Sequence, residues 1–286
     1  MTQFSILGIF VLSTLSSSAF GNVLAPRGPR DVEGCGGSIF VEDAVVIDAP
    51  LSANCKWQIK TDENRVLVFT VVSAGGNFKQ VEEFLSIHDG LGLDSSVLLF
   101  ENQKVHEVSK KELPEAIYTT GSVAEVRFKK TPTSVFKLKI QKAVNCPFNL
   151  GAESQCGRVV DETSCYCATF TKRDQTSQTS YCDSNAMKLW AIESYEEEFA
   201  IQTVWGTSNT MWTSGSDEQM EGKWIWETTG SNLYPGYANW ADGQPDNLGQ
   251  EGTENCLHIN GSRNGRVGWN NLPCSNLLDA ICEAHS

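Results

Sequence analysis

A Gln-Pro-Asp run at residues 244–246 is the part of this sequence best suited to bind a ligand. Calcium is a hard cation that takes roughly six to eight oxygen ligands from carboxylates, amide carbonyls and backbone carbonyls. Gln244 and Asp246 can offer two converging side-chain oxygens if Pro245 is cis, because a cis peptide turns both flanking side chains to one side. Asp242 and Asp246 also resemble the acid pair of a glycosidase, but a bound cation explains them better.

Motifs for enzymatic chemistry are missing from the rest of the sequence. The four histidines, His88, His106, His258 and His285, show no zinc-ligand spacing with cysteines or acids. The chain has no Gly-x-Ser-x-Gly elbow and no glycine-rich phosphate loop. Paired cysteines would leave no thiol nucleophile. We therefore predict a binding protein and not an enzyme.

The charge of the chain narrows the class of partner. The 286 residues include 22 Lys and Arg against 35 Asp and Glu, a formal net charge of −13. This balance argues against nucleic acid or an anionic membrane surface as the main partner. The apolar share of 40% is enough to bury cores, so the chain is not expected to be disordered.

The N-terminus reads as an export signal. Residues 4–15 are a short apolar core, and Ala19-Phe20-Gly21 gives the small-x-small pattern of a cleavage site, so residues 1–21 are predicted to be a signal peptide. No later stretch is apolar for the 18 or so residues that a membrane span needs. We expect a secreted, extracellular protein in an oxidising compartment, where the ten cysteines form five disulfides.

Three composition changes meet near Asn145-Cys146-Pro147. Residues 22–145 carry 15 basic and 16 acidic side chains, whereas residues 146–286 carry 7 and 19. Eight of the ten cysteines and seven of the eight tryptophans lie in the second half. The sequence therefore predicts two domains, residues 35–145 and 146–286, with almost no linker.

The first half reads as β-structure, with short alternating segments bounded by turn residues. These segments are residues 55–59, 66–72, 84–88, 97–100, 124–128 and 135–140. Their spacing favours an all-β sandwich, in which Cys35 and Cys55 can join the first strand to the second.

The first half resembles a CUB domain. The resemblance is carried by Cys35-Gly36-Gly37, Cys55-x-Trp57-x-Ile59, residues 84–90 (FLSIHDG), Gly121-Ser122 and the strand that ends at Ile140. The second disulfide usual in that family has no cysteine here. Many CUB domains bind calcium near the Asp-Gly pair, but a simple turn at Asp89-Gly90 is the preferred interpretation. The resemblance implies a role in association with extracellular proteins.

The second half contains a helix signal before a long irregular stretch. Ser194 and Glu197 form a capping-box pattern that opens a helix to about Trp205, burying Phe199, Ala200 and Ile201. A further helix is predicted over residues 172–186. Residues 207–253 are rich in Trp, Gly and Asn and show little periodicity, which suits a functional loop.

An ordered set of motifs in residues 146–286 resembles a C-type lectin-like domain, which implies an α+β fold. The motifs, in chain order, are Cys182, LWAI at 189–192, MWTSG at 211–215, WIWE at 224–227, YANW at 237–240, QPD at 244–246, ENC at 254–256, VGWNN at 267–271, Cys274 and ICE at 281–283. The family pattern implies the disulfides Cys182–Cys282 and Cys256–Cys274. The other four cysteines allow three pairings, of which Cys156–Cys165 with Cys146–Cys167 is favoured.

The same resemblance implies a calcium-dependent sugar site. By position, its calcium and carbohydrate ligands are Gln244, Asp246, Glu254, Asn270 and Asn271. The order amide–Pro–acid is associated with galactose-type ligands. Two departures stand out: family members that bind calcium usually have Asp at the position of Asn271, and residues 247–253 contain no aromatic side chain for the sugar to stack on.

The function predicted from the sequence is therefore galactose-type recognition of microbial or cell-surface glycans, as in innate immunity. The alternative is an extracellular protein-interaction module with a lectin-like fold that binds no sugar. The stretch 260–266 (NGSRNGR) is polar and turn-rich, so it is predicted to be an exposed hairpin tip, where the sequon Asn260-Gly261-Ser262 carries a glycan.

Overall fold

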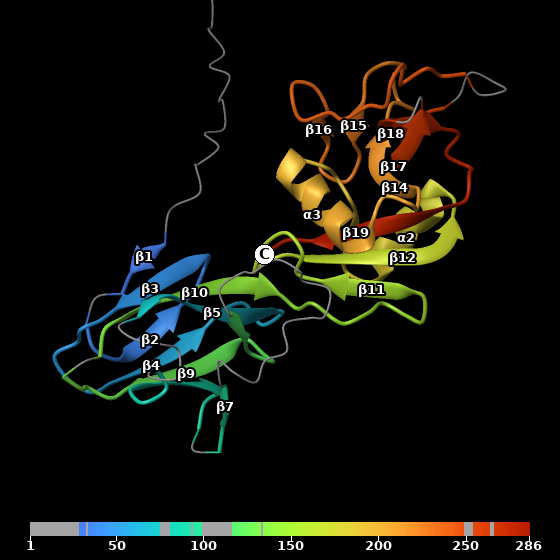
Figure 1. Cartoon of the computed structure of the whole chain (residues 1–286). Coiled ribbons are helices and arrows are strands. Elements are labelled where there is room, and N and C mark those ends of the chain that lie inside the picture. The colour runs from blue at the N-terminus through green and yellow to red at the C-terminus, as the bar shows by residue number, and fades with distance from the viewer. Residues whose placement is uncertain are drawn as a thin grey trace, which may run out of the picture.

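The chain folds into two bodies that lie end to end (Figure 1). This computed structural model describes residues 29–32, 34–74, 81–92, 94–98, 116–132, 134–248, 254–263 and 266–286. The predicted signal peptide, residues 1–21, lies outside these ranges. Within them, no helix has both the length and the apolar character needed to cross a membrane.

The first body consists of two five-stranded sheets. One has the order β1-β3-β10-β5-β8, with the bounds Arg30–Asp31, Ala44–Asp48, Phe136–Val144, Arg65–Ala74 and Ala116–Tyr118. The other has the order β2-β4-β9-β6-β7, with the bounds Gly37–Phe40, Cys55–Lys60, Val123–Phe128, Leu85–Asp89 and Ser96–Leu98. The predicted β-structure is present in the described part of this half.

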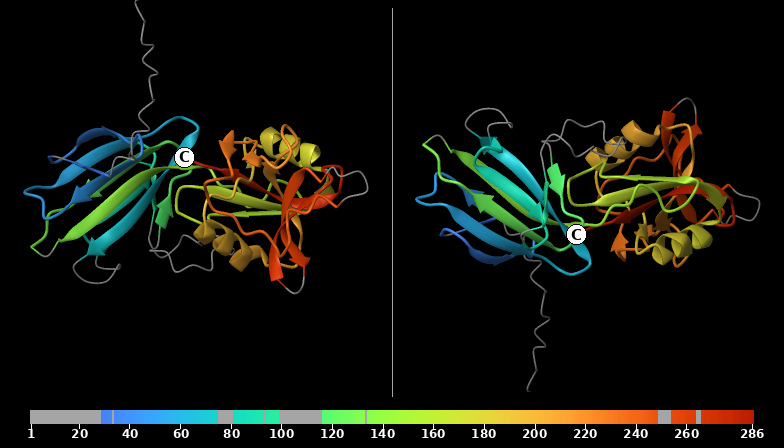
Figure 2. Two further views of the ribbon diagram at one scale, coloured as in Figure 1. Left: turned by 90° about the horizontal axis from the view of Figure 1, so that it is seen from above. Right: turned by 90° about the horizontal axis from the view of Figure 1, so that it is seen from below.

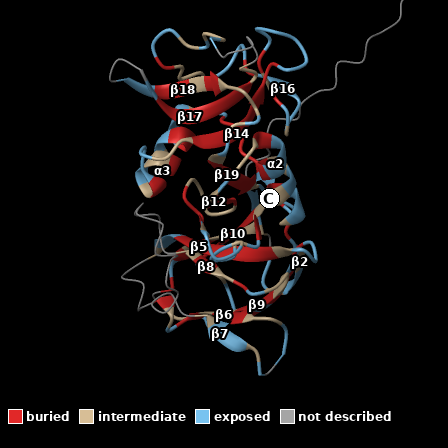
Figure 3. Cartoon of the chain, turned by 90° about the vertical axis from the view of Figure 1, so that its right-hand side faces the viewer, coloured by how far each residue is buried: buried red, intermediate tan, exposed pale blue. Residues whose placement is uncertain are grey.

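One apolar core lies between these sheets (Figure 3). Alternation along β4 buries Cys55, Trp57 and Ile59 and leaves Lys56 and Lys60 exposed, because successive side chains of a strand point to opposite faces. Phe69 on β5 and Leu138 on β10 belong to the same buried cluster. The Asp89 carboxylate accepts the Thr120 amide N–H at 3.1 and 3.2 Å, which fits the turn interpretation of Asp89-Gly90.

The second body combines two helices with a nine-stranded sheet (Figures 1 and 2). The main path is β11-β12-β19-β14-β15-β16, with the bounds Ser154–Gly157, Cys165–Arg173, Leu278–Ala284, Met211–Ser216, Ile225–Trp226 and Ser231–Asn232. Off this path, β13 (Lys188–Leu189) pairs with β19, and β17 (Cys256–Arg263) pairs with β14 and β18 (Arg266–Leu272). The helices are α2 (Gln175–Ser184) and α3 (Tyr195–Trp205).

Helix α3 begins at the predicted cap but turns a different face inward. The Ser194 hydroxyl accepts the Glu197 amide N–H at 3.1 Å. Ile201 is buried as predicted, whereas Phe199 is wrongly predicted, with 56% of its surface exposed. The inward face includes Glu197 and Glu198, because buried aromatic N–H and O–H groups donate to both carboxylates.

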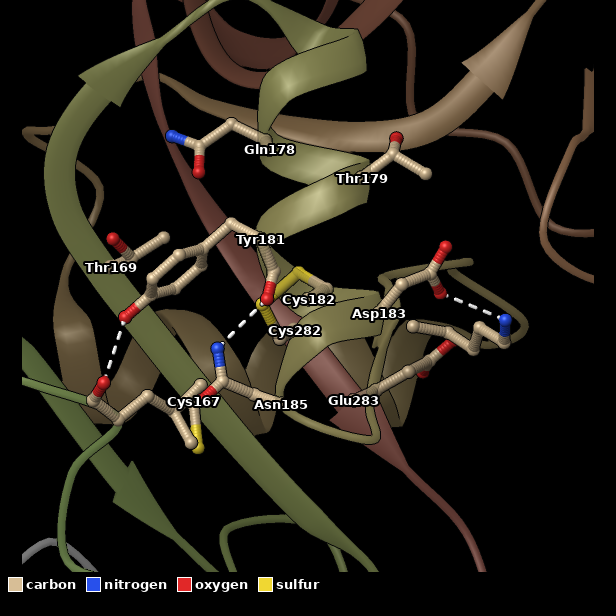
Figure 4. Close-up of a disulfide and its surroundings, with 12 residues drawn as sticks. Cys167, Thr169, Gln178, Thr179, Tyr181, Cys182, Asp183, Asn185, Cys282 and Glu283 are labelled. Atoms are coloured by element: carbon tan, nitrogen blue, oxygen red, sulfur yellow. Dashed lines mark hydrogen bonds and ion pairs between the residues drawn. A yellow bond between two sulfur atoms is a disulfide. The ribbon is translucent and has the colours of Figure 1, made fainter.

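Five disulfides are present, and three match the predicted pairs: Cys35–Cys55, Cys182–Cys282 and Cys256–Cys274. The Cys182–Cys282 bond ties α2 to β19 (Figure 4). In the same view, the Asn185 side-chain amide donates to the Tyr181 carbonyl oxygen. Lys188 forms an ion pair with Asp183 at 2.8 Å. These contacts fix the turn that follows α2.

The predicted pairs Cys146–Cys167 and Cys156–Cys165 are wrong. The bonds are Cys146–Cys165 and Cys156–Cys167. Cys156 on β11 lies directly opposite Cys167 on β12 in the antiparallel register, with their Cα atoms 4.0 Å apart. Cys165 lies two residues earlier on the same strand, where it meets the chain that arrives from β10 through Cys146.

The predicted hairpin over residues 260–266 is present, because β17 and β18 pair up to Arg263 and Arg266, but Asn260 itself does not lie at its exposed tip. Asn260 lies within β17 and is buried, because its amide nitrogen donates to the Asn209 carbonyl at 2.8 Å and its oxygen accepts from Gln202 at 3.2 Å. The nitrogen that would carry a glycan is therefore hydrogen-bonded and buried in the folded protein, and the glycan at Asn260 stays a prediction.

Residues 158–164, a loop of the second body, contact the first body. The Thr70 hydroxyl donates to Glu162 Oε2 at 2.9 Å, and the Tyr118 hydroxyl donates to the Glu162 carbonyl at 3.1 Å. The buried Arg158 guanidinium lies 4.3 Å from the Tyr118 ring centroid and donates to the Val144 carbonyl. These contacts connect the two bodies through specific polar groups.

His285 contacts the same loop through Ser164. Its Nδ1 lies 3.0 Å from Ser164 Oγ, and its Nε2 lies 3.1 Å from Glu283 Oε2. The Ser164 hydroxyl in turn donates to Asp161 at 3.0 Å. The hydrogen bond with Glu283 raises the pKa of His285, so its protonated form is favoured at this position.

Candidate functional site

The Gln-Pro-Asp run lies at the end of the second body that is far from the first (Figures 1 and 2). The Gln244–Pro245 peptide is cis. Just before this run, residues 239–241 lie against β18: the Trp269 N–H donates to the Asn239 carbonyl at 2.7 Å, and the Ala241 N–H donates to the Trp269 carbonyl at 2.9 Å. Gly268 permits this close approach, because a Cβ there would lie 2.7 Å from the Asn239 carbonyl oxygen and 2.7 Å from the Ala241 nitrogen.

The buried carboxylate of Glu198 fixes residues 239–241 against β18. Glu198 accepts from the Tyr237 hydroxyl at 2.8 Å, from the Trp269 indole N–H at 3.1 Å and from the Asn239 amide at 3.2 Å. Burial raises the pKa of Glu198, and these three donors offset part of that effect. The packing of α3 therefore decides where the Gln-Pro-Asp loop meets β18.

Hydrogen bonds join all five predicted site residues, and four of them meet around the Asp246 amide and the Asn271 side chain. The Asp246 amide N–H donates to Gln244 Oε1 at 3.1 Å and to Asn271 Oδ1 at 3.2 Å. The Asn271 side-chain nitrogen donates to the Glu254 carbonyl oxygen at 2.9 Å. The run at 244–246, the segment at 254 and β18 therefore converge on one point.

Asn271 uses both of its polar atoms to hold this loop closed. Its oxygen accepts from the start of the loop and its nitrogen donates to the end, while the side chain is almost fully buried. An aspartate here could accept from Asp246 but could not donate to Glu254. The departure from the usual family residue therefore has a structural role.

Asn270, the fifth predicted residue, is oriented by His258. Its Nδ2 donates to the Asn271 carbonyl at 3.0 Å and lies 3.1 Å from His258 Nε2. His258 Nδ1 lies 3.0 Å from the Ile259 carbonyl, which assigns the imidazole proton to Nδ1 and leaves Nε2 as the acceptor. Burial lowers the pKa of His258 and so favours this neutral form.

Both described hydrogen bonds of the Asn270 side chain use its nitrogen, so its oxygen can act as an acceptor. A cavity of about 400 Å³ is lined by Gln244, Asn270 and His258 together with Thr210, Ala241, Gly261 and Ser262. Amide side chains from two different segments thus border the same space.

Two further residues belong to this region, and sequence reasoning missed them. Among the described residues, the buried oxygens Asp217 Oδ1 and Asn255 Oδ1 have no hydrogen-bond partner. The two residues are neighbours, because the Asp217 N–H donates to the Asn255 carbonyl at 3.2 Å. Burial raises the pKa of Asp217, and the charge of Glu221 adds to that rise. The acidic pair Asp217-Glu218 directly after the strand was the available signal.

The donor set fits a hard cation. Unpartnered buried oxygens cost about 1–3 kcal/mol each, and a cation would remove that cost. Within the described ranges, no three His, Cys, Asp or Glu side chains gather as a metal cluster, so amide oxygens must supply much of any ligand shell. Calcium accepts amide oxygens, but a low ligand charge weakens its affinity.

Comparisons with known proteins agree with the lectin-like part of this description. A family model described as "Lectin C-type domain" matches residues 171–284. Perlucin of Haliotis laevigata is 32% identical over 123 residues, which cover 42% of this chain and 76% of perlucin. Asialoglycoprotein receptor 1 of Mus musculus is 28% identical over 185 residues, covering 62% of this chain and 60% of the receptor.

Further relatives and one solved structure complete the comparison. Salivary C-type lectin 2 of Aedes albopictus is 27% identical over 139 residues, covering 45% of this chain and 88% of that protein. The mouse scavenger receptor C-type lectin carbohydrate-recognition domain is 28% identical, with a TM-score of 0.38, covering 44% of this chain and 91% of that domain. By its family match and its relatives, this chain belongs to the family of proteins with a C-type lectin domain.

Proposed function

We propose that this protein binds galactose-type carbohydrate through calcium held by Gln244, Asp246, Glu254, Asn270 and Asn271. Members of its family are generally non-enzymatic binding proteins, carbohydrate is their general ligand, and they usually use calcium. The observation that carries the proposal is the hydrogen-bond network that gathers these five residues, of which Gln244 and Asn270 line one cavity.

In this proposal, Asp246 and Glu254 supply the two formal negative charges, and Gln244 and Asn270 supply neutral amide oxygens. When bound, calcium offers coordination positions to two neighbouring sugar hydroxyls. The chain's part is to orient donors and acceptors around those hydroxyls. An amide at 244 and an acid at 246 place a donor on one side and an acceptor on the other, which is the reason to favour galactose-type over mannose-type hydroxyl geometry.

The roles of the other parts are proposals as well. We propose that the protein is extracellular, in keeping with its salivary lectin relatives. We further propose that the first body is a CUB-type sandwich that associates with extracellular proteins, with the domain boundary near residues 145–146. Its two facing sheets and the Cys35–Cys55 bond support that assignment.

Retention on immobilised galactose tests the sugar proposal. The full chain should be retained in millimolar calcium, released by a chelator, and retained less on immobilised mannose. Glu254→Gln should abolish retention, because it removes one of only two charged ligands. Glu196→Gln, an exposed acid of α3, is the matched control and should be retained like wild type. Calcium-independent retention, or none at all, would reject the proposal.

A second candidate function, protein interaction without sugar, has one observation in its favour. The Asn271 side chain links Asp246 to Glu254 by hydrogen bonds, a structural role that calls for no cation. If calcium titration leaves the thermal midpoint of the full chain unchanged and galactose does not retain it, this second function replaces the first.

A further inference from the structure

A second cavity lies where the two bodies meet. It is separate from the calcium loop, as we call the segment from Gln244 to Glu254 that belongs to the proposed calcium site. Its volume is about 560 Å³, within the range of roughly 300–1,000 Å³ typical of small-ligand sites. Asn64 and Arg65 line it from the first body, and Lys188, Thr228 and His285 line it from the second. Ligand sites favour such domain junctions.

The charged groups around this cavity are mostly cationic, although the chain as a whole is acidic. Lys188 and His285 each pair with one acid, Asp183 at 2.8 Å and Glu283 at 3.1 Å. Glu283 is buried and is the one acidic side chain among the described lining residues. Arg65 adds a further positive charge, so the charges of the lining side chains favour an anionic ligand.

Arg65 is the group in this cavity best prepared to receive a carboxylate. In the described contacts, its side chain makes one hydrogen bond, to the Asn64 carbonyl at 3.4 Å. A guanidinium carries five N–H donors in a planar fork that matches the two oxygens of a carboxylate. Most of that donor capacity is therefore available on the cavity wall.

The remaining lining suits a hydroxylated ring. The side chains of Asn64 and Asn145 carry both donors and acceptors, and the Asn185 side-chain oxygen adds an acceptor, as sugar hydroxyls require. Pro147, Leu150 and Met187 add apolar surface, against which the C–H face of a ring can pack. A simple anion such as phosphate would use the charges but not this surface.

We propose that the junction cavity binds a small acidic sugar, with its carboxylate on Arg65 and its hydroxyls on the asparagine side chains. The ligand touches both bodies, so it also holds them together. This site does not depend on the calcium loop at the far end of the second body.

Isothermal titration of the full chain with glucuronate, in the presence of a chelator that silences the calcium loop, tests the proposal. Binding is expected with a Kd on the order of 1 mM, because one carboxylate fork and a few hydrogen bonds act in an open cavity. Glucose, which lacks the carboxylate, and acetate, which lacks the ring, should each bind at least tenfold more weakly.

Variants locate the site. Arg65→Gln should weaken glucuronate binding at least tenfold, whereas Lys142→Gln, which removes a cation paired with Asp62 on the first body, should leave it unchanged. The His285 imidazole resonances of the wild type should shift on titration, and this readout does not depend on how any variant folds.

Three results would overturn the proposal: no heat and no His285 shift with glucuronate, equal affinity for glucose or acetate, or equal affinity in Arg65→Gln. Galactose retention is measured in calcium and this titration in chelator, so failure of one leaves the other standing.

Discussion

The two bodies of this protein are stabilised by different kinds of interior. The first buries alternating apolar side chains between two sheets and has one disulfide. The second has four disulfides and buries carboxylates, amides and indoles that hydrogen-bond to one another. Apolar packing tolerates changes of similar volume, whereas a buried polar group needs its specific partner. The second body should therefore be the more sensitive to single polar substitutions.

The largest expected effect separates the bodies by their disulfides. The joint change Cys182→Ser and Cys282→Ser removes a disulfide with a sequence separation of 100 residues. The joint change Cys35→Ser and Cys55→Ser removes one with a separation of 20. Loop-closure entropy predicts losses of about 4.7 kcal/mol for a loop of roughly 100 residues and about 3 kcal/mol for one of roughly 15. Urea unfolding followed by tryptophan fluorescence measures both. Equal losses from the two links would contradict this ordering.

The next largest effect concerns the buried carboxylate of α3. Glu198→Gln replaces an acceptor of four donors by an amide that must turn its own N–H groups toward them, which should cost about 2 kcal/mol. Its exposed helix neighbour changed in the same way, Glu196→Gln, should stay within about 0.5 kcal/mol of wild type. Urea unfolding measures the difference, and a neutral Glu198→Gln would refute the idea that polar pairing stabilises this body.

Asn271→Asp sharpens the comparison at the loop. Without calcium, it should lower stability by about 1–2 kcal/mol, because the Glu254 carbonyl loses its donor and faces a carboxylate instead. With calcium, the added charge should increase the rise in thermal midpoint, since a tenfold tighter Kd adds about 1.4 kcal/mol. Calorimetry with and without calcium checks both. A variant as stable as wild type without calcium would show that Asn271 does not brace the loop.

The smallest effect lies at the junction between the bodies. His285 is faced by Glu283, Asp161, Glu197 and the Tyr166 ring, and its pKa is raised mainly by the hydrogen bond with Glu283. A raised pKa adds stability that is complete below the unfolded value of about 6.5 and is lost as pH rises through the folded value. The wild-type thermal midpoint should therefore fall over that window, and His285→Gln should flatten the decline. An unchanged slope in the variant would exclude His285 as its source.

Much of the fold could be predicted because its signals are local. Alternation around Trp57 marked β4, the Ser194 cap marked the start of α3, and the ordered lectin motifs marked the second body. Phe199 was predicted on the wrong face of α3. A helical pattern does not reveal that the Glu197 and Glu198 carboxylates accept hydrogen bonds from groups in the interior. Asp217 and Asn255 escaped notice because their unpartnered oxygens arise only when two strands meet.

The sequence by itself determined the types of element, the lectin-like family and the cluster of residues around Gln-Pro-Asp. Only the tertiary structure decided which cysteines pair among Cys146, Cys156, Cys165 and Cys167, because pairing follows strand register and register depends on contacts across the sheet. It likewise decided that Asn271 joins both ends of the loop, that Asn260 is enclosed, and that Arg65 and His285 border one cavity. Each of these outcomes requires groups distant in the chain to meet, and no local pattern encodes such a meeting.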